Sequence, residues 1–343
     1  MNGKERVYAA ILRKNPDRAP RYIWVGEGAA QNLCKELGLN KNQLDALIGN
    51  DILQSWLSIS GQLERPSEAG SSFIDEWGIT WTKDGYYNMV INHPMSGMDE
   101  KAIAGYPLPD PYAPYRYDKL KTMISKYSRT HFIGADISGS LFDPACHLRG
   151  MEDFLMDMAA EAPEADVLLD RIAAFTTSVA LESINLGVDW IWLGDDVGSQ
   201  KSMTMGPDLW RKYFKTRMKN IIDAIKKVKP DMIIAYHSCG SIFPIIGDLA
   251  EIGVDVLNPL QSSAADMDHK KIAGMYGDKM TFMCGLDTQN FMVGASPDEV
   301  YSAMREELNI YDKKGGYIAA VSHTLQHDIP VKNIIAMLDA LNS

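Results

Sequence analysis

The chain has 343 residues, of which 46% are hydrophobic and 23% are charged, so it can bury a large core and has the composition of an ordinary globular protein. Its formal net charge of −11 argues against a nucleic-acid partner and disfavours a substrate that carries many carboxylates. The sequence contains no apolar run of about 18 residues and no secretory signal pattern, so we expect no membrane partner and a cytoplasmic location.

The N-terminal third predicts two strands, two helices and an insertion. Residues 1–18 have a helical rhythm and form an N-terminal extension. Strands are expected at 20–25 and 51–59, and helices near 28–37 and 41–49. Residues 60–115 are rich in Gly, Pro, Ser and Asp, which is typical of an insertion, and they include a candidate β-hairpin.

From residue 131 onward, short β-prone runs alternate with longer amphipathic stretches, which indicates βα units and a parallel sheet. Pro207 introduces one of the helices, and Ser296 and Pro297 cap and open another. With the two upstream strands the total is eight, so we predict that residues 1–343 form a single (β/α)8 TIM-barrel domain with the insertion 60–115 near the barrel mouth. The six strands of this part are expected at 131–138, 188–196, 232–240, 254–259, 280–287 and 316–323.

Polar side chains follow each of these six strands. One such residue is most simply a capping or loop group, but the strand ends of a parallel barrel meet at the face where active sites lie. Six convergent ends therefore predict a functional site. The residues, in chain order, are Asp136, Asp195 with Asp196, His237 with Cys239, Asn258 with Gln261, Cys284 with Asp287, and His323.

His237 and Cys239 are the most informative pair. Residues two apart on a strand point to the same side, and thiolate with imidazole is a donor set that zinc accepts. A catalytic zinc takes three protein ligands, so the third must come from another strand, and Cys284 and His323 both remain candidates. A buried His and Cys without a metal is the simpler interpretation, and a Cys–His nucleophilic pair is a third, which no oxyanion-hole pattern accompanies.

Asp195 and Asp196 are candidate catalytic residues. Because they are neighbours on a strand, only one of them can face the barrel interior, and the alternative is that the pair ends the strand and caps a turn. The residues that we expect to bind substrate are Trp24, Asp136, Trp192, Asp287 and Gln289. For the tryptophans, packing in the core or at the rim is the simpler interpretation.

The chain also has four cysteines, Cys34, Cys146, Cys239 and Cys284, at irregular spacings. Thiols stay reduced in a cytosolic protein, so we expect a special cysteine to be a ligand or nucleophile instead of half of a disulfide. The sequence leaves a homodimer open.

Several motifs together resemble the uroporphyrinogen decarboxylase superfamily. They are DRAP at 17–20, GSLF followed by LRGMEDFL, the stretch at 194–211 that begins with GDD and ends with PDLWR, YHSCGSI, CGLDTQ and GGYIAAVSHTLQHDIPVKNI. The resemblance spans nearly the whole chain and implies a (β/α)8 barrel. It also implies one of two activities: decarboxylation of uroporphyrinogen, or zinc-dependent methyl transfer involving a corrinoid (cobalamin) cofactor on a partner protein.

The segment after DRAP distinguishes the two activities. The decarboxylases carry an arginine-rich segment there that holds the porphyrinogen carboxylates, whereas this chain has Arg21 alone and an acidic Glu27. In the methyltransferase branch, the resemblance implies that His237 and Cys239 are zinc ligands. His323 takes the position of the family's third ligand, a cysteine, while Cys284 has the more suitable chemistry.

These observations predict a zinc-dependent methyltransferase that moves a methyl group between a small methylated substrate, such as a methoxylated aromatic or another methyl ether, and the partner's corrinoid. If the protein activates a thiol instead, the same residues serve the reverse direction. A uroporphyrinogen-type decarboxylase is the alternative, and a metal-free corrinoid-binding barrel is the second alternative.

Overall fold

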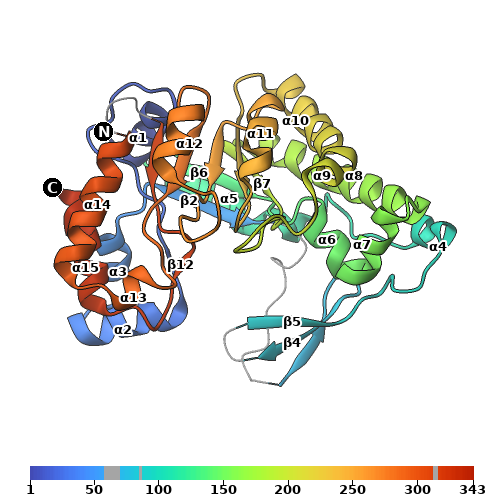
Figure 1. The fold of residues 1–343 in the computed structure, drawn as a ribbon, viewed down its shortest axis with the longest axis horizontal. Helices are drawn as coiled ribbons and strands as arrows, with labels where there is room; N and C mark the ends of the chain where they lie inside the picture. Colours follow the sequence, from blue (N-terminus) through green and yellow to red (C-terminus); the bar gives the residue numbers. More distant parts are fainter. Residues whose placement is uncertain (58–69, 85–86, 312–315) are drawn as a thin grey trace.

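The computed structural model describes residues 1–57, 70–84, 87–311 and 316–343. Seven parallel strands form one curved sheet in the order β11-β10-β9-β8-β7-β6-β2 (Figure 1). Their bounds are β2 Ile52–Trp56, β6 Phe132–Asp136, β7 Trp190–Gly194, β8 Ile233–His237, β9 Val256–Asn258, β10 Thr281–Cys284 and β11 Tyr317–Ala319. A separate parallel pair consists of β1 Trp24–Val25 and β12 Thr324–Leu325.

Residues 20–25, which end in β1, close the sheet into a barrel. On one side the Tyr22 backbone N–H donates to the carbonyl of Ala319, the last residue of β11, at 2.9 Å. On the other side the Asp51 N–H donates to the Arg21 carbonyl, also at 2.9 Å, at the start of β2. All eight predicted strands are therefore present and the (β/α)8 barrel is confirmed, although positions 58 and 59 of the second predicted strand lie outside the described residues.

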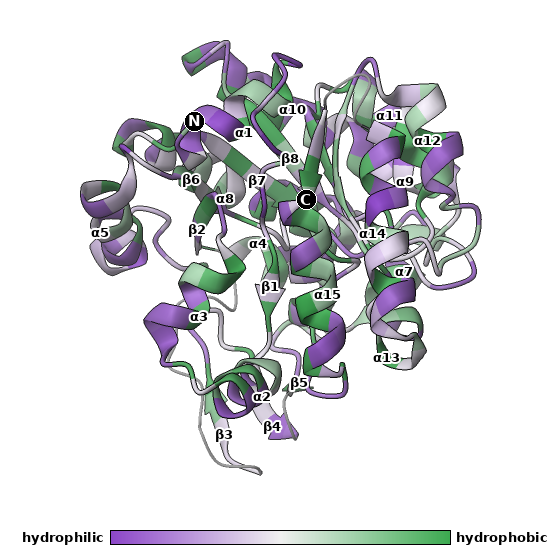
Figure 2. Ribbon diagram, turned by 90° about the vertical axis from the view of Figure 1, so that its left-hand side faces the viewer, coloured by the Kyte–Doolittle hydropathy of each residue, from purple (hydrophilic) through white to green (hydrophobic). Residues whose placement is uncertain are grey.

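Helices cover the outer face of the barrel, and Figure 2 shows hydrophobic residues concentrated in the central strands and hydrophilic residues along the helices. The predicted helices near 28–37 and 41–49 are confirmed, and Ser296 caps α14 as expected, its Oγ accepting from the Glu299 N–H at 3.4 Å. No helix in the described ranges is long and apolar enough to cross a membrane. The bounds are α1 Gly3–Ile11, α2 Glu27–Leu37, α3 Lys41–Ile48, α4 Glu100–Gly105, η1 Pro114–Tyr117, α5 Asp118–Tyr127, α6 Phe142–Arg149, α7 Met151–Ala159, α8 Pro163–Leu186, α9 Pro207–Trp210, η2 Arg211–Lys215, α10 Thr216–Val228, η3 Phe243–Ile245, α11 Ile246–Glu251, α12 His269–Tyr276, α13 Phe291–Gly294, α14 Pro297–Tyr311 and α15 Val331–Asn342.

Successive residues of each strand alternate between the barrel interior and the layer under the helices. On β7, Trp190 and Trp192 belong to the interior cluster, whereas Ile191 and Leu193 pack in the larger cluster outside. The same alternation places Met283 of β10 inside. The interior cluster comprises Val7, Ile11, Ile52, Phe132, Trp190, Trp192, Ile233, Ala235, Val256, Met283, Ile318 and Ala320.

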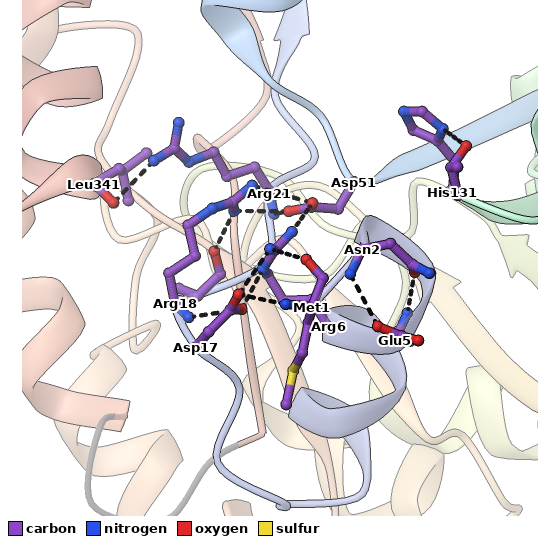
Figure 3. Close-up of polar contacts among 12 residues, drawn as sticks. Met1, Asn2, Glu5, Arg6, Asp17, Arg18, Arg21, Asp51, His131 and Leu341 are labelled. Atoms are coloured by element: carbon purple, nitrogen blue, oxygen red, sulfur yellow. Dashed lines mark hydrogen bonds and ion pairs between the residues drawn. The ribbon is translucent and has the colours of Figure 1, made fainter.

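Helix α1 closes the end of the barrel where the strands begin, because Val7 and Ile11 pack into the interior cluster. An ion-pair network joins this helix to the start of β2 (Figure 3). Arg6 Nε lies 2.6 Å from Asp17 Oδ1, and Arg18 Nη1 lies 2.8 Å from Asp51 Oδ2. These charges lie at the N-terminal end of the barrel, so they hold the fold together and leave the opposite face for the site.

The insertion carries a three-stranded antiparallel sheet of β3 Ser72–Ile74, β4 Thr80–Asp84 and β5 Tyr87–Asn92. Figure 1 shows it projecting away from the barrel. The predicted hairpin is confirmed by the β4–β5 pair. Strand β3 was not predicted, and positions 60–69 and 85–86 of the predicted insertion lie outside the described residues.

Candidate active site

A cavity of about 640 Å³ opens at the C-terminal ends of the strands. Its lining comes from the ends of β1, β2, β6, β7 and β8, from the start of α6 and from the loop that joins β11 to β12. Aromatic side chains form part of the wall, and carboxylates form another part. The aromatic residues are Tyr22, Trp24 and Trp56, and the carboxylates belong to Asp136, Asp143, Asp195 and Asp196.

His237, Cys239 and His323 gather at this face, with one ligand atom of each lying within 4.8 Å of the other two. His237 Nε2 and Cys239 Sγ are 3.5 Å apart. Two ligands of a tetrahedral zinc with ordinary zinc–nitrogen and zinc–sulfur bonds would be about 3.6 Å apart. The spacing of this pair therefore fits zinc, and of the two candidates for the third ligand the structure brings His323 to the cluster.

The neighbouring strand fixes the orientation of His237. Its register partner is Asn258 of β9, whose Nδ2 donates to the Met283 carbonyl at 2.8 Å. The amide oxygen of Asn258 must then be the group that lies 2.6 Å from His237 Nδ1, so Nδ1 carries the proton and donates. The lone pair of Nε2 consequently points to the cluster, as in histidines that bind metals.

Two side-chain acceptors hold the backbone of the turn at Cys239 in place. The Cys239 N–H donates to Asp196 Oδ1 at 2.9 Å, and the Gly240 N–H donates to Gln261 Oε1 at 2.8 Å. Gly194 of β7 is the register partner of His237. Only glycine fits at this position, because a Cβ there would lie 2.4 Å from the His237 carbonyl oxygen. This close approach lets β8 carry His237 to the barrel rim.

Asp195 and Asp196 point in opposite directions, as their positions on consecutive residues require. Asp195 is buried and accepts from the N–H groups of Leu141 and Asp143, so it caps the start of α6. Asp196 Oδ1 lies 3.6 Å from His237 Nε2, and its side chain is 51% exposed. Asp196 is therefore the one that faces the cluster.

Cys284 does not join the cluster, because Met283 points into the barrel and Cys284 therefore points outward. Its Sγ lies 3.3 Å from the Tyr311 hydroxyl and 3.6 Å from Glu307 Oε1. His269 completes a second buried group there, with Nδ1 only 2.6 Å from Glu307 Oε1. That distance is shorter than the roughly 3.3 Å between two ligands of a tetrahedral zinc, so this group is a hydrogen-bonded network.

Two of the five residues expected to bind substrate, Trp24 and Asp136, line the cavity. Trp192 is fully buried in the interior cluster and is not a lining residue, although its ring stacks on His237 with centroids 6.0 Å apart. Asp287 and Gln289 are not among the residues that line the cavity. Asp287 instead caps α13, its Oδ2 accepting from the Asn290 and Phe291 N–H groups, and Gln289 is exposed.

Sequence reasoning missed the residues that support Asp136. Gln54 Nε2 donates to Asp136 Oδ2 at 2.6 Å, and Ser138 Oγ donates to its Oδ1 at 2.6 Å. Burial raises the pKa of Asp136 and these hydrogen bonds oppose the rise. The register of β2 with β6 was the missing signal, because Gln54 pairs with Gly134 and thus lies beside the end of β6.

The charges of the cavity are mostly negative. Among the described lining residues, Lys119 carries the sole permanent positive charge, against four aspartates. Burial and the charge of Asp196 raise the pKa of the Cys239 thiol, and burial and the nearby His237 lower the pKa of His323. A cation at the cluster would therefore meet a neutral imidazole and would itself be needed to hold a thiolate.

One family model and several curated proteins match this chain. The family model described as "Uroporphyrinogen decarboxylase (URO-D)" matches residues 82–343. Uroporphyrinogen decarboxylase of Legionella pneumophila (strain Lens) is 24% identical over 212 residues, which span 60% of this chain and 57% of that protein. Uroporphyrinogen decarboxylase of Coxiella burnetii (strain Dugway 5J108-111) is 19% identical over 357 residues, covering 99% of this chain and 94% of that protein.

Among solved structures, one described as "methyltransferase from Methanosarcina mazei" is similar in fold. It aligns with a TM-score of 0.73 at 18% identity and covers 100% of this chain and 98% of its own. The proteins that this chain resembles are thus named for two different reactions, so the chemistry must be argued from the cavity.

Proposed function

The chain belongs to the uroporphyrinogen decarboxylase (URO-D) family, and from this premise we propose that it is a zinc-dependent methyltransferase. In this proposal it moves a methyl group between a small methylated substrate and a corrinoid cofactor carried on a partner protein. The observation that carries the proposal is the cluster of His237, Cys239 and His323 at the mouth of the barrel. The corrinoid and its carrier come from the resemblance to the methyltransferase branch.

The three side chains would hold the ion as two neutral imidazoles and one thiolate. Bound zinc acts as a Lewis acid, which would make the oxygen of a methyl ether a better leaving group. With one thiolate and two neutral imidazoles, a bound Zn²⁺ would keep one net positive charge. A zinc ion with a second thiolate would have no net charge and would polarise a bound oxygen less strongly. This donor set favours an ether over a thiol as the group to be activated.

The wall of the cavity supports an aromatic methyl ether. The Trp24 ring contacts both histidines, with centroids 5.7 Å from His237 and 5.9 Å from His323. Tyr22 and Trp56 extend this apolar surface. A methoxylated ring could therefore stack beside the cluster with its methyl group near the metal ligands.

The names of the curated relatives favour decarboxylation of uroporphyrinogen as a second candidate. The cavity charge argues against it, because a substrate with eight carboxylates would face four aspartates. Arg21, which remains after the DRAP motif, donates to the Leu341 carbonyl and to Asn342 Oδ1 instead of reaching the cavity. Incubation with uroporphyrinogen should yield no coproporphyrinogen, and formation of that product would overturn our proposal.

Elemental analysis of the purified protein tests the metal. We expect roughly one zinc per chain, lost in His237→Ala, Cys239→Ala and His323→Ala because three protein ligands make a catalytic zinc site. Cys284→Ala is the matched control, since its thiol points away from the cluster, and it should retain zinc. An active wild-type protein free of metal would rule out the zinc site. A metal-free protein that binds a corrinoid but transfers no methyl group would instead favour the metal-free corrinoid-binding barrel.

A further inference from the structure

We propose that Asp143 is the general acid of this site and gives its proton to the oxygen that separates from the methyl group. This inference rests on the proposed function, because it concerns cleavage of a methyl ether. It assigns a role to a residue that the sequence did not single out.

Asp143 is the second residue of α6 and lines the cavity beside the end of β7. Both of its carboxyl oxygens lie 3.3 Å from the Asp196 N–H, so the side chain leans toward the strand end that also carries Asp196. Asp196 in turn contacts His237 of the cluster, as described above. A substrate oxygen beside the cluster would therefore enter the same pocket that Asp143 lines.

Three carboxyl groups meet at this wall, and they cannot all be ionised in a partly buried place. Asp195 is the one best suited to keep its charge inside the protein, because Leu141 N–H donates to both its oxygens, at 2.9 and 3.1 Å, and Asp143 N–H donates to one at 3.1 Å. Asp196 is half exposed and accepts a 2.9 Å hydrogen bond from the Cys239 N–H. Asp143 receives only the longer 3.3 Å contacts, so it is the group that holds a proton.

Burial, followed by the charges of Asp195 and Asp196, raises the pKa of Asp143 well above its usual value. Burial also raises the pKa of Asp195, to about 7, and the backbone N–H groups from which it accepts oppose that rise. His147 lies one turn further along α6 and also lines the cavity, but burial lowers its pKa to about 4, which leaves it neutral. The Cys146 thiol is kept neutral by burial, and Lys119 supplies the cavity's positive charge from α5.

The bond between the methyl carbon and the ether oxygen breaks, and the methyl group passes to the cobalt(I) of the corrinoid, whose electron pair forms the new bond. The oxygen keeps the pair of the broken bond and takes the proton of Asp143 to become a hydroxyl group. Asp143 regains a proton from water at the open mouth of the cavity.

The test is Asp143→Asn in the zinc-loaded protein, with cob(I)alamin and a series of aryl methyl ethers whose product phenols differ in acidity. General acid catalysis matters most for a poor leaving group. We expect kcat/KM to fall at least about 100-fold for the ether of the least acidic phenol, and far less for that of the most acidic phenol. Zinc content and binding of the product phenol, followed by tryptophan fluorescence, should stay as in the wild type.

Asp208→Asn is the matched control, because Asp208 is also the second residue of a helix but its side chain is 98% exposed. It should leave every rate unchanged. A loss in Asp143→Asn that is equal for all ethers, or no loss, would overturn the role of Asp143, as would a loss accompanied by loss of zinc. If the wild-type protein methylates cobalt from no ether in the series, it is the proposed function that fails.

Discussion

The orientation of His237 depends on a contact from the next strand. Because the Asn258 amide donates to the Met283 carbonyl, its oxygen is left to accept from His237 Nδ1, which directs Nε2 to the cluster. A histidine without this partner could present either nitrogen or turn its ring away. The strength of zinc binding should therefore depend on Asn258, although it is not itself a ligand.

We predict that Asn258→Leu lowers zinc affinity about 10- to 100-fold, because the leucine keeps the volume but removes the acceptor. Competition with a chromogenic chelator measures the dissociation constant. Asn258→Asp is the control, since the carboxylate still accepts from Nδ1, and its affinity should stay near that of the wild type. An unchanged affinity in Asn258→Leu would mean that the amide has no part in holding the imidazole.

Two of the three residues of the cluster could be predicted from their spacing in the sequence. Spacing alone placed His237 and Cys239 on one side of a strand, and the structure brings them together. Spacing could not separate Cys284 from His323, because β10 is buried on both faces and its apolar sequence does not show which residues point inward. Met283 points into the barrel, so its neighbour Cys284 points outward and His323 is the residue that joins the cluster. The direction of Met283 is known only from the packing of the folded chain.

At the scale of elements, a buried ion pair joins α12 to α14. His269 Nδ1 lies 2.6 Å from Glu307 Oε1, and its Nε2 lies 2.7 Å from the Leu260 carbonyl, so both nitrogens face acceptors and the charged ring fits best. Burial lowers the pKa of His269, but the hydrogen bond and charge of Glu307 outweigh it, and the pKa is raised above 6.5. The stability that this pair contributes is complete below pH 6.5 and is lost as the pH rises through the raised value.

We predict that Glu307→Gln lowers the free energy of unfolding by about 3 kcal/mol near pH 6, since it leaves a buried charge without its partner. The difference from the wild type should shrink as the pH rises through the raised pKa of His269, because the ring of the wild type then loses its proton. Urea unfolding over a series of pH values from 6 upward measures this difference. Glu306→Gln, which breaks the exposed pair with Lys270, is the control and should change little. A loss independent of pH would contradict a charged His269.

The six barrel strands from β6 to β11 were predictable from the sequence because each is a short, almost entirely buried run that precedes an amphipathic stretch. Strand β3 was not, because three residues from Ser72 to Ile74 carry too little alternation to be recognised. The contacts of Asp136 with Gln54 and of His237 with Asn258 were hidden for a related reason. They depend on strand register, which the hydrophobic pattern of doubly buried strands does not specify.

At the scale of the whole molecule, net charge and local charge agree. The chain carries a formal charge of −11, and its cavity has four aspartates against one lysine among the described lining residues. The site should therefore prefer an uncharged methoxylated ring to one that carries a carboxylate. We predict that KM for a methoxyphenol is about 10-fold lower than for the corresponding methoxybenzoate at low salt, and that added salt narrows the difference. A preference for the benzoate would contradict this account of the cavity.

Transfer of an intact methyl group from an ether to cobalt is the reaction that the proposed function requires. The zinc-loaded protein would be incubated with cob(I)alamin and an aryl ether whose methyl group is fully deuterated, and the methylcobalamin formed would be analysed by mass spectrometry. We predict that methylcobalamin carries the complete deuterated methyl group, and that none forms with His237→Ala or with protein stripped of zinc. Equal label transfer by the zinc-free protein would contradict the role of zinc. The absence of labelled methylcobalamin from zinc-loaded wild type with any methyl ether would contradict the proposed methyl transfer.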